Sequence, residues 1–331
     1  MSRSIVILPD DSAQPLLQAI SGAQLSLRIK MFVFSDPGLL EAVIAAHKRG
    51  VKVRVMLNPE RRDGEKENDA TRSHLQQAGV DVKDSNPSFD LTHEKSMVID
   101  DATAFVESLN WETRNLTGTR DYAVITSHKH EVGEIMRCFD ADWDRTEFTA
   151  DGQSHLIWCT GNGRQRLCQL IDSAKHTLWL QNERYQDPVI IEHVVRAYRR
   201  GVKIHVMARP PHKLKKDKLV EGVSGLRILE DLGIPIRKLK HIKLHAKLLF
   251  ADDARAIIGS INFAPGSFDS RRELAIEVDD EPILKRIRQT LHDDWEKAKP
   301  LDLSDAGLLE ELEGSDPNVA EDLGIENVKR P

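Results

Sequence analysis

The sequence is poor in cysteine and in aromatic residues, and it has no long apolar run. Its three cysteines, Cys138, Cys159 and Cys168, are odd in number and lack the spacing of metal ligands, which argues against a disulfide framework or a zinc site. No uncharged apolar stretch approaches the roughly 18 residues of a membrane span, and the apolar core of the N-terminal segment is too short for a signal peptide. These absences predict a cytoplasmic protein with reduced thiols and no transmembrane segment, which would reach a membrane only peripherally.

An overall excess of positive charge is also lacking. The formal net charge is −6, and residues 301–331 hold nine of the 53 acidic residues but only two of the 47 basic ones. The rest of the chain is close to neutral, which excludes a globally basic surface for nucleic acid. Residues 301–331 are predicted to form an acidic, mobile tail outside the functional site.

The chain contains an internal repeat. "DPGLLEAVIAAHKRGVKVRVML", from Asp36, aligns with "DPVIIEHVVRAYRRGVKIHVMA", from Asp187, at an offset of 151 residues. Each segment places aspartate at a helix N-cap and proline at the first helical position, then glycine (Gly50 or Gly201) where a left-handed C-cap belongs, before a β-branched strand. Such a match predicts two copies of one structural unit.

Later blocks extend the repeat to about residues 15–148 and 166–299. "RDYAVIT", from Arg120, matches "RELAIEV", from Arg272, at an offset of 152. The predicted strands are 25–32, 51–57, 95–99, 103–109 and 122–126, then 177–181, 202–208, 246–250, 256–261 and 274–278. With helices between them, each copy should form a mostly parallel or mixed sheet covered by helices. The expected domains are residues 1–150 and 151–300, joined through a polar linker at 149–155.

A short polar motif recurs at the same place in both copies. His93, Lys95 and Asp100 in "THEKSMVID" correspond to His245, Lys247 and Asp252 in "KLHAKLLFADD". If each segment is a strand, the histidine and the lysine share a face, so that a proton-transfer or nucleophilic group lies beside a fixed positive charge. One match alone is weak evidence, but two at corresponding positions of a repeat are strong evidence of a shared site.

Further polar residues follow each histidine at equal distances. They are Ser108 and Ser260, Asn110 and Asn262, and the carboxylates Asp121 and Glu273. The lysines and asparagines supply donors for the non-bridging oxygens of a phosphate, and each serine stands two residues before its asparagine. A carboxylate can hold one imidazole nitrogen, so that the other nitrogen faces the substrate in a defined tautomer. Neither copy alone holds enough groups for a complete reaction.

These paired motifs, with "GSINFAPGSFDSRREL" after the second, resemble the phospholipase D superfamily. The resemblance implies two α-β-α sandwich units related by a pseudo-twofold axis, with one active site at their interface. It implies no metal ion and no cofactor, and one chain suffices for the site. One histidine attacks phosphorus and the other protonates the leaving alcohol. We assign attack to His93 and acid/base catalysis to His245. Ser108, Ser260, Asn110 and Asn262 are expected to bind phosphate, whereas Asp100 and Asp252 are expected to be structural.

The superfamily motifs leave the substrate open. The leading hypothesis is a phosphodiesterase or phosphatidyltransferase acting on phospholipid headgroups by hydrolysis or by transfer to an alcohol; the alternatives are a nuclease and a non-catalytic binding protein. Basic runs from Arg209 and Arg237 are either solvated loops or an attractor for an anionic lipid surface or nucleic acid. Aromatic residues make up only 5% of the chain, which disfavours a groove that stacks single-stranded bases.

One residue departs from the superfamily pattern. Glu107 stands in the first copy where Gly259 stands in the second. A carboxylate near a phosphate pocket would repel the substrate unless it points away or pairs with a base such as Arg114.

Overall fold

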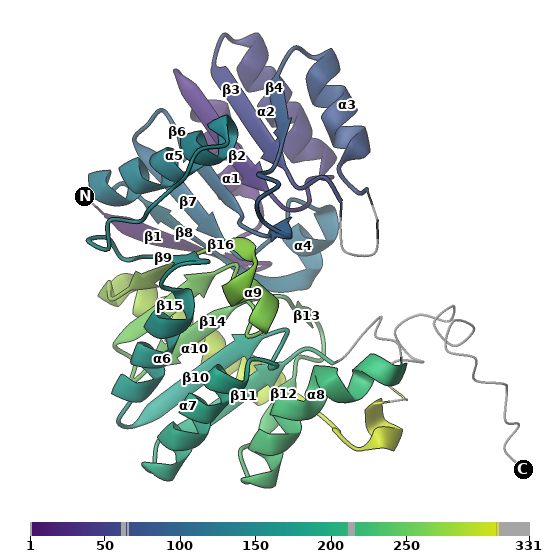
Figure 1. Ribbon diagram of the computed structural model, residues 1–331, viewed down its shortest axis with the longest axis vertical. Coiled ribbons are helices and arrows are strands. Elements are labelled where there is room, and N and C mark those ends of the chain that lie inside the picture. Colours follow the sequence, from purple (N-terminus) through teal and green to yellow (C-terminus); the bar gives the residue numbers. More distant parts are fainter. Residues whose placement is uncertain (1, 61–63, 65, 211–215, 309, 311–331) are drawn as a thin grey trace, which may run out of the picture.

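A computed structural model describes residues 2–60, 64, 66–210, 216–308 and 310. The two copies of the repeat form two similar α/β halves that lie against each other, the first coloured purple to blue and the second teal to yellow in Figure 1. Among the described residues, no helix is long and apolar enough to span a bilayer.

The described residues of the first half form a mixed sheet, a short strand outside it (β5) and five helices. The strands are β1 (Arg3–Leu8), β2 (Ser26–Met31), β3 (Lys52–Leu57), β4 (Asp81–Asp84), β5 (Leu91–Thr92), β6 (Ser96–Ile99), β7 (Thr103–Glu107) and β8 (Thr119–Thr126). The helices are α1 (Gln14–Gly22), α2 (Pro37–Lys48), α3 (Asp69–Gln77), α4 (Thr113–Gly118) and α5 (Lys129–Asp144). The sheet order is β1-β8-β7-β6-β2-β3-β4, with β2, β3 and β4 parallel and the other neighbours antiparallel.

The second half repeats this plan. Its strands are β9 (Leu156–Cys159), β10 (Thr177–Asn182), β11 (Lys203–Ala208), β12 (Ile236–Lys238), β13 (Lys243–Leu244), β14 (Leu248–Ala251), β15 (Arg255–Gly259), β16 (Arg271–Val278) and β17 (Lys299–Pro300). Its helices are α6 (Gly163–Ser173), α7 (Pro188–Arg199), α8 (Lys216–Asp231), α9 (Pro265–Asp269) and α10 (Glu281–Lys297). The order β12-β11-β10-β14-β15-β16, with β9 paired to β16, is equivalent to that of the first sheet read from β4 to β1. The second sheet has one more strand, β17, which pairs with β12 at its edge.

The cap residues of the repeat act as the sequence predicts. Asp36 caps α2 by accepting a hydrogen bond from the N–H of Leu39 at 2.9 Å, and Asp187 caps α7 through Ile190 at 3.0 Å. Gly50 and Gly201, just beyond these helices, have φ values of 96° and 88°. Only glycine adopts such values without steric cost, so the same sharp exit feeds β3 and β11.

The hydrophobic core joins the two halves. One cluster lies between the first sheet and α1–α3, and another lies between the second sheet and α6–α8. A further cluster combines β7, β8 and helix α5 of the first half with β9, β14–β16 and helix α10 of the second, including Tyr122, Trp158 and Phe250. The halves therefore share one buried interface instead of meeting through a linker alone.

Each half also contributes a short strand that pairs with the sheet of the other half. β5 of the first half runs parallel to β16, pairing Leu91 with Arg271, and β13 of the second half runs parallel to β8, pairing Lys243 with Thr119. These contacts are reciprocal, as in a twofold interface where each side uses the same surface. This exchange brings the segments that carry His93 and His245 to the boundary between the halves.

The structure corrects three expectations from the sequence. His93 and Lys95 lie in an extended segment between β5 and β6, not within a strand. The expectation of a mobile tail from residue 301 is wrong for its first part, because Leu301, Leu303 and Leu308 are buried in the core of the second half. Residues 311–331 of that tail, and 211–215 of the first basic run, lie outside the described residues. The short strands β4, β5, β9, β12, β13 and β17, and the edge strand β1, were not predicted.

Candidate active site between the two halves

His93 is held by the second half of the chain. Its backbone N–H donates to the carbonyl oxygen of Arg272 at 2.9 Å, which continues the β5–β16 pairing by one residue. Its Nδ1 lies 2.9 Å from Oε2 of Glu273 and 3.1 Å from the carbonyl oxygen of Ser260. Two acceptors on Nδ1 fix the tautomer with the proton there, so the lone pair is on Nε2.

His245 is held in the same way by the first half. Its backbone N–H donates to the carbonyl oxygen of Arg120 at 3.2 Å, and its Nδ1 lies 2.8 Å from Oδ1 of Asp121. The carboxylates Asp121 and Glu273 thus each contact Nδ1 of a histidine, but of the histidine in the other half, and their role in orienting the imidazoles stays a prediction. Burial opposes the ionisation of both carboxyl groups, yet the histidine and lysine charges beside them keep their pKa values below the usual range.

Buried ion pairs support both crossed contacts. Arg272, next to Glu273, binds Asp142 of α5 at 2.9 and 3.0 Å, and Arg120, next to Asp121, binds Asp294 of α10 at 2.7 and 2.8 Å. All four side chains are at least nine-tenths buried. Because each pair joins the two halves, the position of each orienting carboxylate depends on packing across the interface.

The two motif lysines are buried beside their histidines. Lys95 Nζ donates to the carbonyl oxygen of His93 at 2.6 Å, and Lys247 Nζ donates to the carbonyl oxygen of His245. Burial, and then the charge of Lys247, lowers the pKa of Lys95 to about 7. Because the charge of Lys247 contributes to the shift of Lys95, the two lysines lie close enough to interact, and an anion bound near both would relieve their repulsion.

The burial of His93 disfavours the charged form of its imidazole. Desolvation is the largest influence on this imidazole, and although Glu273 opposes it, the pKa falls to about 3 with a further contribution from Lys95. His93 is therefore neutral over the physiological range, with an unprotonated Nε2.

The surroundings of the two histidines differ at one pair of positions in the repeat. Phe32 contacts His93 edge-on, with 4.8 Å between ring centroids. The equivalent residue of the second half is Glu183, whose Oε2 lies 2.7 Å from Lys247 Nζ and 3.6 Å from His245 Nε2. The sequence analysis missed Glu183, although extending the aligned blocks by four residues would have paired it with Phe32.

Asn110 and Asn262 carry unsatisfied polar atoms. Both residues are buried, and in the described structure neither side-chain oxygen has a hydrogen-bond partner. Buried polar atoms are usually paired, so each of these oxygens can accept a hydrogen bond from a ligand, whereas Nδ2 of Asn110 already donates to Glu112 at 3.1 Å. The assignment of these residues to phosphate binding remains a prediction.

Ser108 and Ser260 do not present free donors. The hydroxyl of Ser108 donates to Asp121 at 2.6 Å, and that of Ser260 donates to the carbonyl oxygen of Leu274 at 3.2 Å. Both residues are fully buried. The expectation that they bind phosphate is therefore corrected, because their hydroxyl protons are already used within the protein.

The motif aspartates serve the backbone. Asp100 accepts hydrogen bonds from the N–H groups of Gln24, Leu25 and Ser26 at 2.7–3.1 Å. Asp252 accepts the equivalent bonds from residues 175–177 at 2.7–2.8 Å. Each carboxylate fixes the start of an interior strand of its sheet, β2 or β10, which agrees with the structural role expected for it.

Glu107 pairs with Trp111 and not with Arg114. Its Oε2 accepts a hydrogen bond from Trp111 Nε1 at 2.9 Å, and Arg114 pairs instead with Glu112 and Glu67. Burial raises the pKa of Glu107 to about 8, although Trp111 and Lys95 oppose the rise. The carboxyl group is thus protonated at neutral pH and does not repel an anion. At the equivalent Gly259, an added Cβ would collide with the carbonyl oxygen of Leu274.

One cluster of potential metal ligands lies near the interface. Glu94, Cys138 and Asp142 come together, but Lys30 Nζ lies between them, at 3.0 Å from Glu94 and 2.7 Å from Asp142. The lysine ammonium supplies the positive charge in this cluster.

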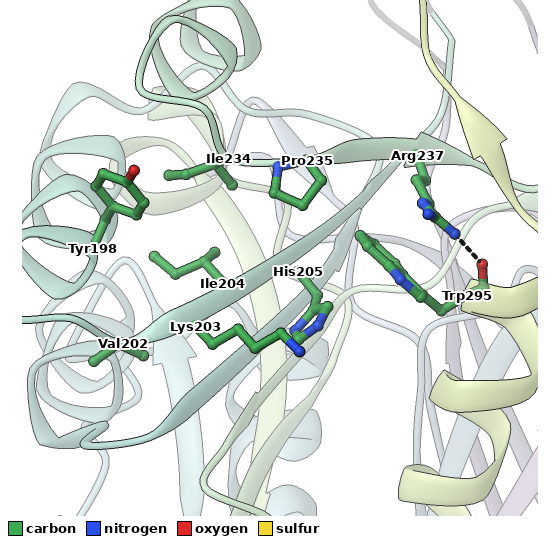
Figure 2. Close-up of a pocket in the computed structure, with 9 residues that line it drawn as sticks. All are labelled: Tyr198, Val202, Lys203, Ile204, His205, Ile234, Pro235, Arg237 and Trp295. Atoms are coloured by element: carbon green, nitrogen blue, oxygen red, sulfur yellow. Dashed lines mark hydrogen bonds between the residues drawn. The ribbon is translucent and has the colours of Figure 1, made fainter.

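A cavity of about 340 Å³ lies away from both histidines. Figure 2 shows its lining, in which Arg237 stacks on Trp295 with the guanidinium carbon 4.4 Å from the ring centroid. Lys203 and His205, near the N-terminal end of β11, line the cavity. Arg209, which contacts Glu183, follows the last residue of that strand. The cavity is therefore at the opposite end of β11 from the paired histidines.

Comparison with known proteins identifies the family. The model of the family described as "Cardiolipin synthase, PLD-like domain" matches the chain twice, over residues 16–143 and 167–295. The chain belongs to the phospholipase D-like family. The two matches coincide with the two halves of the fold, and together they span more than half of the chain.

Relatives in this family differ in the reaction named for them. The chain is 32% identical over 131 residues to the mitochondrial cardiolipin hydrolase of Homo sapiens, which covers 39% of this chain and 50% of that protein. It is 24% identical over 327 residues to cardiolipin synthase B of Salmonella typhi, covering 83% of this chain and 76% of that protein. The crystal structure of polyphosphate kinase from Porphyromonas gingivalis shares the fold, with a TM-score of 0.71 at 17% identity, covering 92% of this chain and 49% of the other.

Proposed function

We propose that this protein is a phosphodiesterase or phosphatidyltransferase that acts on phospholipid headgroups through a phosphohistidine intermediate. The observation that carries the proposal is the crossed pairing of His93 with Glu273 and of His245 with Asp121. It occupies Nδ1 of each imidazole with a carboxylate of the other half, so Nε2 is the nitrogen left to react, and each histidine has its motif lysine buried beside it. Family membership and the named activities of the two cardiolipin relatives support a phosphodiester of a lipid as the substrate.

The two histidines have different roles in this proposal. Neutral His93 attacks phosphorus through Nε2, and the bond from phosphorus to the headgroup oxygen breaks. His245 donates a proton from Nε2 to that oxygen, and then accepts a proton from the water or alcohol that releases His93. Lys95, Lys247, Asn110 and Asn262 donate hydrogen bonds to the non-bridging oxygens, whose charge increases in the transition state. Asp121 and Glu273 keep each imidazole in the reactive orientation.

Assays of the purified protein test the substrate and the mechanism together. Phosphatidylcholine, phosphatidylglycerol and single-stranded DNA are each supplied with EDTA to wild type, His93→Asn and His245→Asn. We expect lipid turnover by the wild type and losses on the order of 10³-fold or more in both variants. His130→Asn, at a side chain that is 73% exposed, is the matched control and should retain activity. Turnover of DNA without lipid would instead establish a nuclease.

Trapping of the intermediate assigns the roles. With a radiolabelled phosphodiester, rapid acid-free quenching should leave label on the His245→Asn chain, in which release is slowed, and none on the His93→Asn chain. Label on the latter alone would reverse the assignment. A requirement for a divalent metal, or activity that survives loss of both histidines, would refute the mechanism.

A further inference from the structure

The two copies of the repeat differ at two positions on the His245 side of the site, and the side chains at these positions are in contact in the second half. Where the first half has Phe32 and Asn58, the second half has Glu183 and Arg209, each 151 residues later. Arg209 Nη1 lies 2.7 Å from Oε1 of Glu183, so the two residues that differ from the first half form an ion pair with each other. Asn58 has another use, because its side chain accepts a hydrogen bond from the N–H of Thr92 at 3.0 Å.

Glu183 is a fixed and ionised carboxylate. Lys247 holds one of its oxygens and Arg209 the other, and its side chain is only 12% exposed. Burial opposes its ionisation, but the charges of Lys247, His245 and Arg209 more than offset this and keep its pKa well below the usual range. A carboxylate has about four acceptor sites, so these contacts leave it able to accept another hydrogen bond.

The location of Glu183 determines which part of a substrate it meets. Its Oε2 lies 3.6 Å from Nε2 of His245, the nitrogen that exchanges a proton with the alcohol in the proposed reaction. The reacting oxygen must come within roughly 2.6–3.2 Å of this nitrogen. A group on the next carbon of the alcohol is then beside Glu183. On the opposite side, the ring of Phe32 next to His93 offers no such acceptor.

We propose that Glu183 determines alcohol specificity by accepting a hydrogen bond from a second hydroxyl, on the carbon next to the reacting one. The site then favours vicinal diols of the glycerol type over simple alcohols. The inference rests on the proposed transfer reaction. In that step the alcohol oxygen forms a bond to phosphorus, the bond from phosphorus to His93 Nε2 breaks, and the alcohol proton passes to His245 Nε2. Glu183 remains ionised throughout and supplies orientation.

Competition between two alcohols measures this selectivity directly. The enzyme is given a donor together with 1,2-propanediol and 1-propanol, which differ by one hydroxyl, and the ratio of the two products is determined. Both alcohols compete for the same intermediate, so the ratio is independent of how fast the intermediate forms. We expect the wild type to favour the diol by about tenfold, as for a hydrogen bond to a charged acceptor. Glu183→Ala should reduce the preference to near unity, and 1,3-propanediol should gain less than the vicinal isomer.

A surface carboxylate provides the matched control. Glu192→Gln, on α7 with a side chain 56% exposed, should leave the product ratio unchanged. Glu183→Gln keeps the size of the side chain, so comparison with Glu183→Ala separates loss of the charged acceptor from loss of packing. The melting temperatures of all three variants establish that they are folded.

Two donors distinguish failure of this inference from failure of the proposed function. Phosphatidylcholine vesicles test the lipid substrate, and bis(p-nitrophenyl) phosphate tests transfer in its absence. Equal ratios in the wild type and Glu183→Ala with either donor would overturn the role of Glu183. A different result would also overturn that role: Glu183→Gln leaves the product ratio unchanged and only strengthens inhibition by inorganic phosphate. The carboxylate would then act by opposing the binding of phosphate and not by binding the alcohol. Turnover of bis(p-nitrophenyl) phosphate alone would exclude a phospholipid as the substrate, and the competition between alcohols could still be measured. Turnover of neither donor would overturn both the proposed function and the role of Glu183.

Discussion

At the scale of single residues, Glu107 links the chemistry of the site to stability. It is buried beneath the site, and its pKa is raised to about 8. The unfolded chain releases this proton near pH 4.3, so between about pH 4.5 and 8 the native state holds a proton that the unfolded state has lost. Stability from this group is therefore complete below about pH 4.5 and is lost as the pH rises through about 8, with a slope of at most ~1.4 kcal/mol per pH unit.

Substitution of Glu107 tests that slope. Glu107→Gln keeps the shape and the acceptor for Trp111 Nε1 but removes the titration. We expect the free energy of unfolding, measured by urea denaturation, to fall less between pH 5 and 8 in the variant than in the wild type, by up to a few kcal/mol. The exposed Glu192→Gln should follow the wild-type curve. Parallel curves for Glu107→Gln and wild type would show that Glu107 is already ionised in the native state.

The site residues were predictable only where the two copies agree. His93, Lys95 and Asn110 were found because His245, Lys247 and Asn262 repeat them. The crossing of Asp121 and Glu273 was hidden, because each lies 28 residues after a histidine in both copies and an equal spacing fits a partner in either half. Glu183 was missed for the opposite reason, since its counterpart Phe32 shares no chemistry with it.

At the scale of elements, local signals determined which parts could be predicted. Long helices and central strands have caps and periodic apolar residues, and the predicted strands agree with the observed ones to within a few residues. β5 and β13 have two residues each, too few for any periodic pattern, and they pair with the distant half. Leu301, Leu303 and Leu308 were assigned to a tail because acidic residues surround them, although burial of these leucines outweighs the local charge.

The contact between the turn after β6 and the start of β2 allows a prediction about stability. Asp100, with a φ of 52°, ties the turn after β6 to three N–H groups at the start of β2. Asp100→Asn tolerates this φ but accepts the bonds more weakly, so we expect a loss of about 1–2 kcal/mol in the free energy of unfolding. The kcat/KM of the folded variant should stay near that of the wild type.

The neighbouring aspartate is the control for this turn. Asp101 has a similar φ of 55°, and its carboxylate contacts the side chains of Ser26 and Arg28 at the surface. Asp101→Asn should therefore cost less than Asp100→Asn. If Asp100→Asn instead abolished turnover at unchanged stability, the motif aspartate would belong to the reaction and not to the scaffold.

At the scale of the whole molecule, the two halves build the candidate site together, because the side-chain contacts to Nδ1 of both histidines cross their boundary. Each histidine is fixed by a backbone bond, a carboxylate and a buried ion pair from the other half. Breaking one buried ion pair by removing a single partner typically costs about 3–5 kcal/mol. A half on its own would lose the arginine that pairs with Asp142 or Asp294 and would lack the carboxylate for its histidine.

Complementation tests whether one chain is sufficient. The reciprocal contacts within this chain resemble those of a twofold dimer, so exchange of halves between two copies would build a site of the same form. A His93→Asn chain and a His245→Asn chain, mixed after folding, should show no activity beyond the sum of the separate proteins, because each chain has already paired its own halves. Co-refolding from urea should give the same result if the shared core closes within one chain first. Activity that appears in the co-refolded mixture and elutes at twice the monomer mass would show instead that the halves pair between chains, and that the functional unit is a dimer.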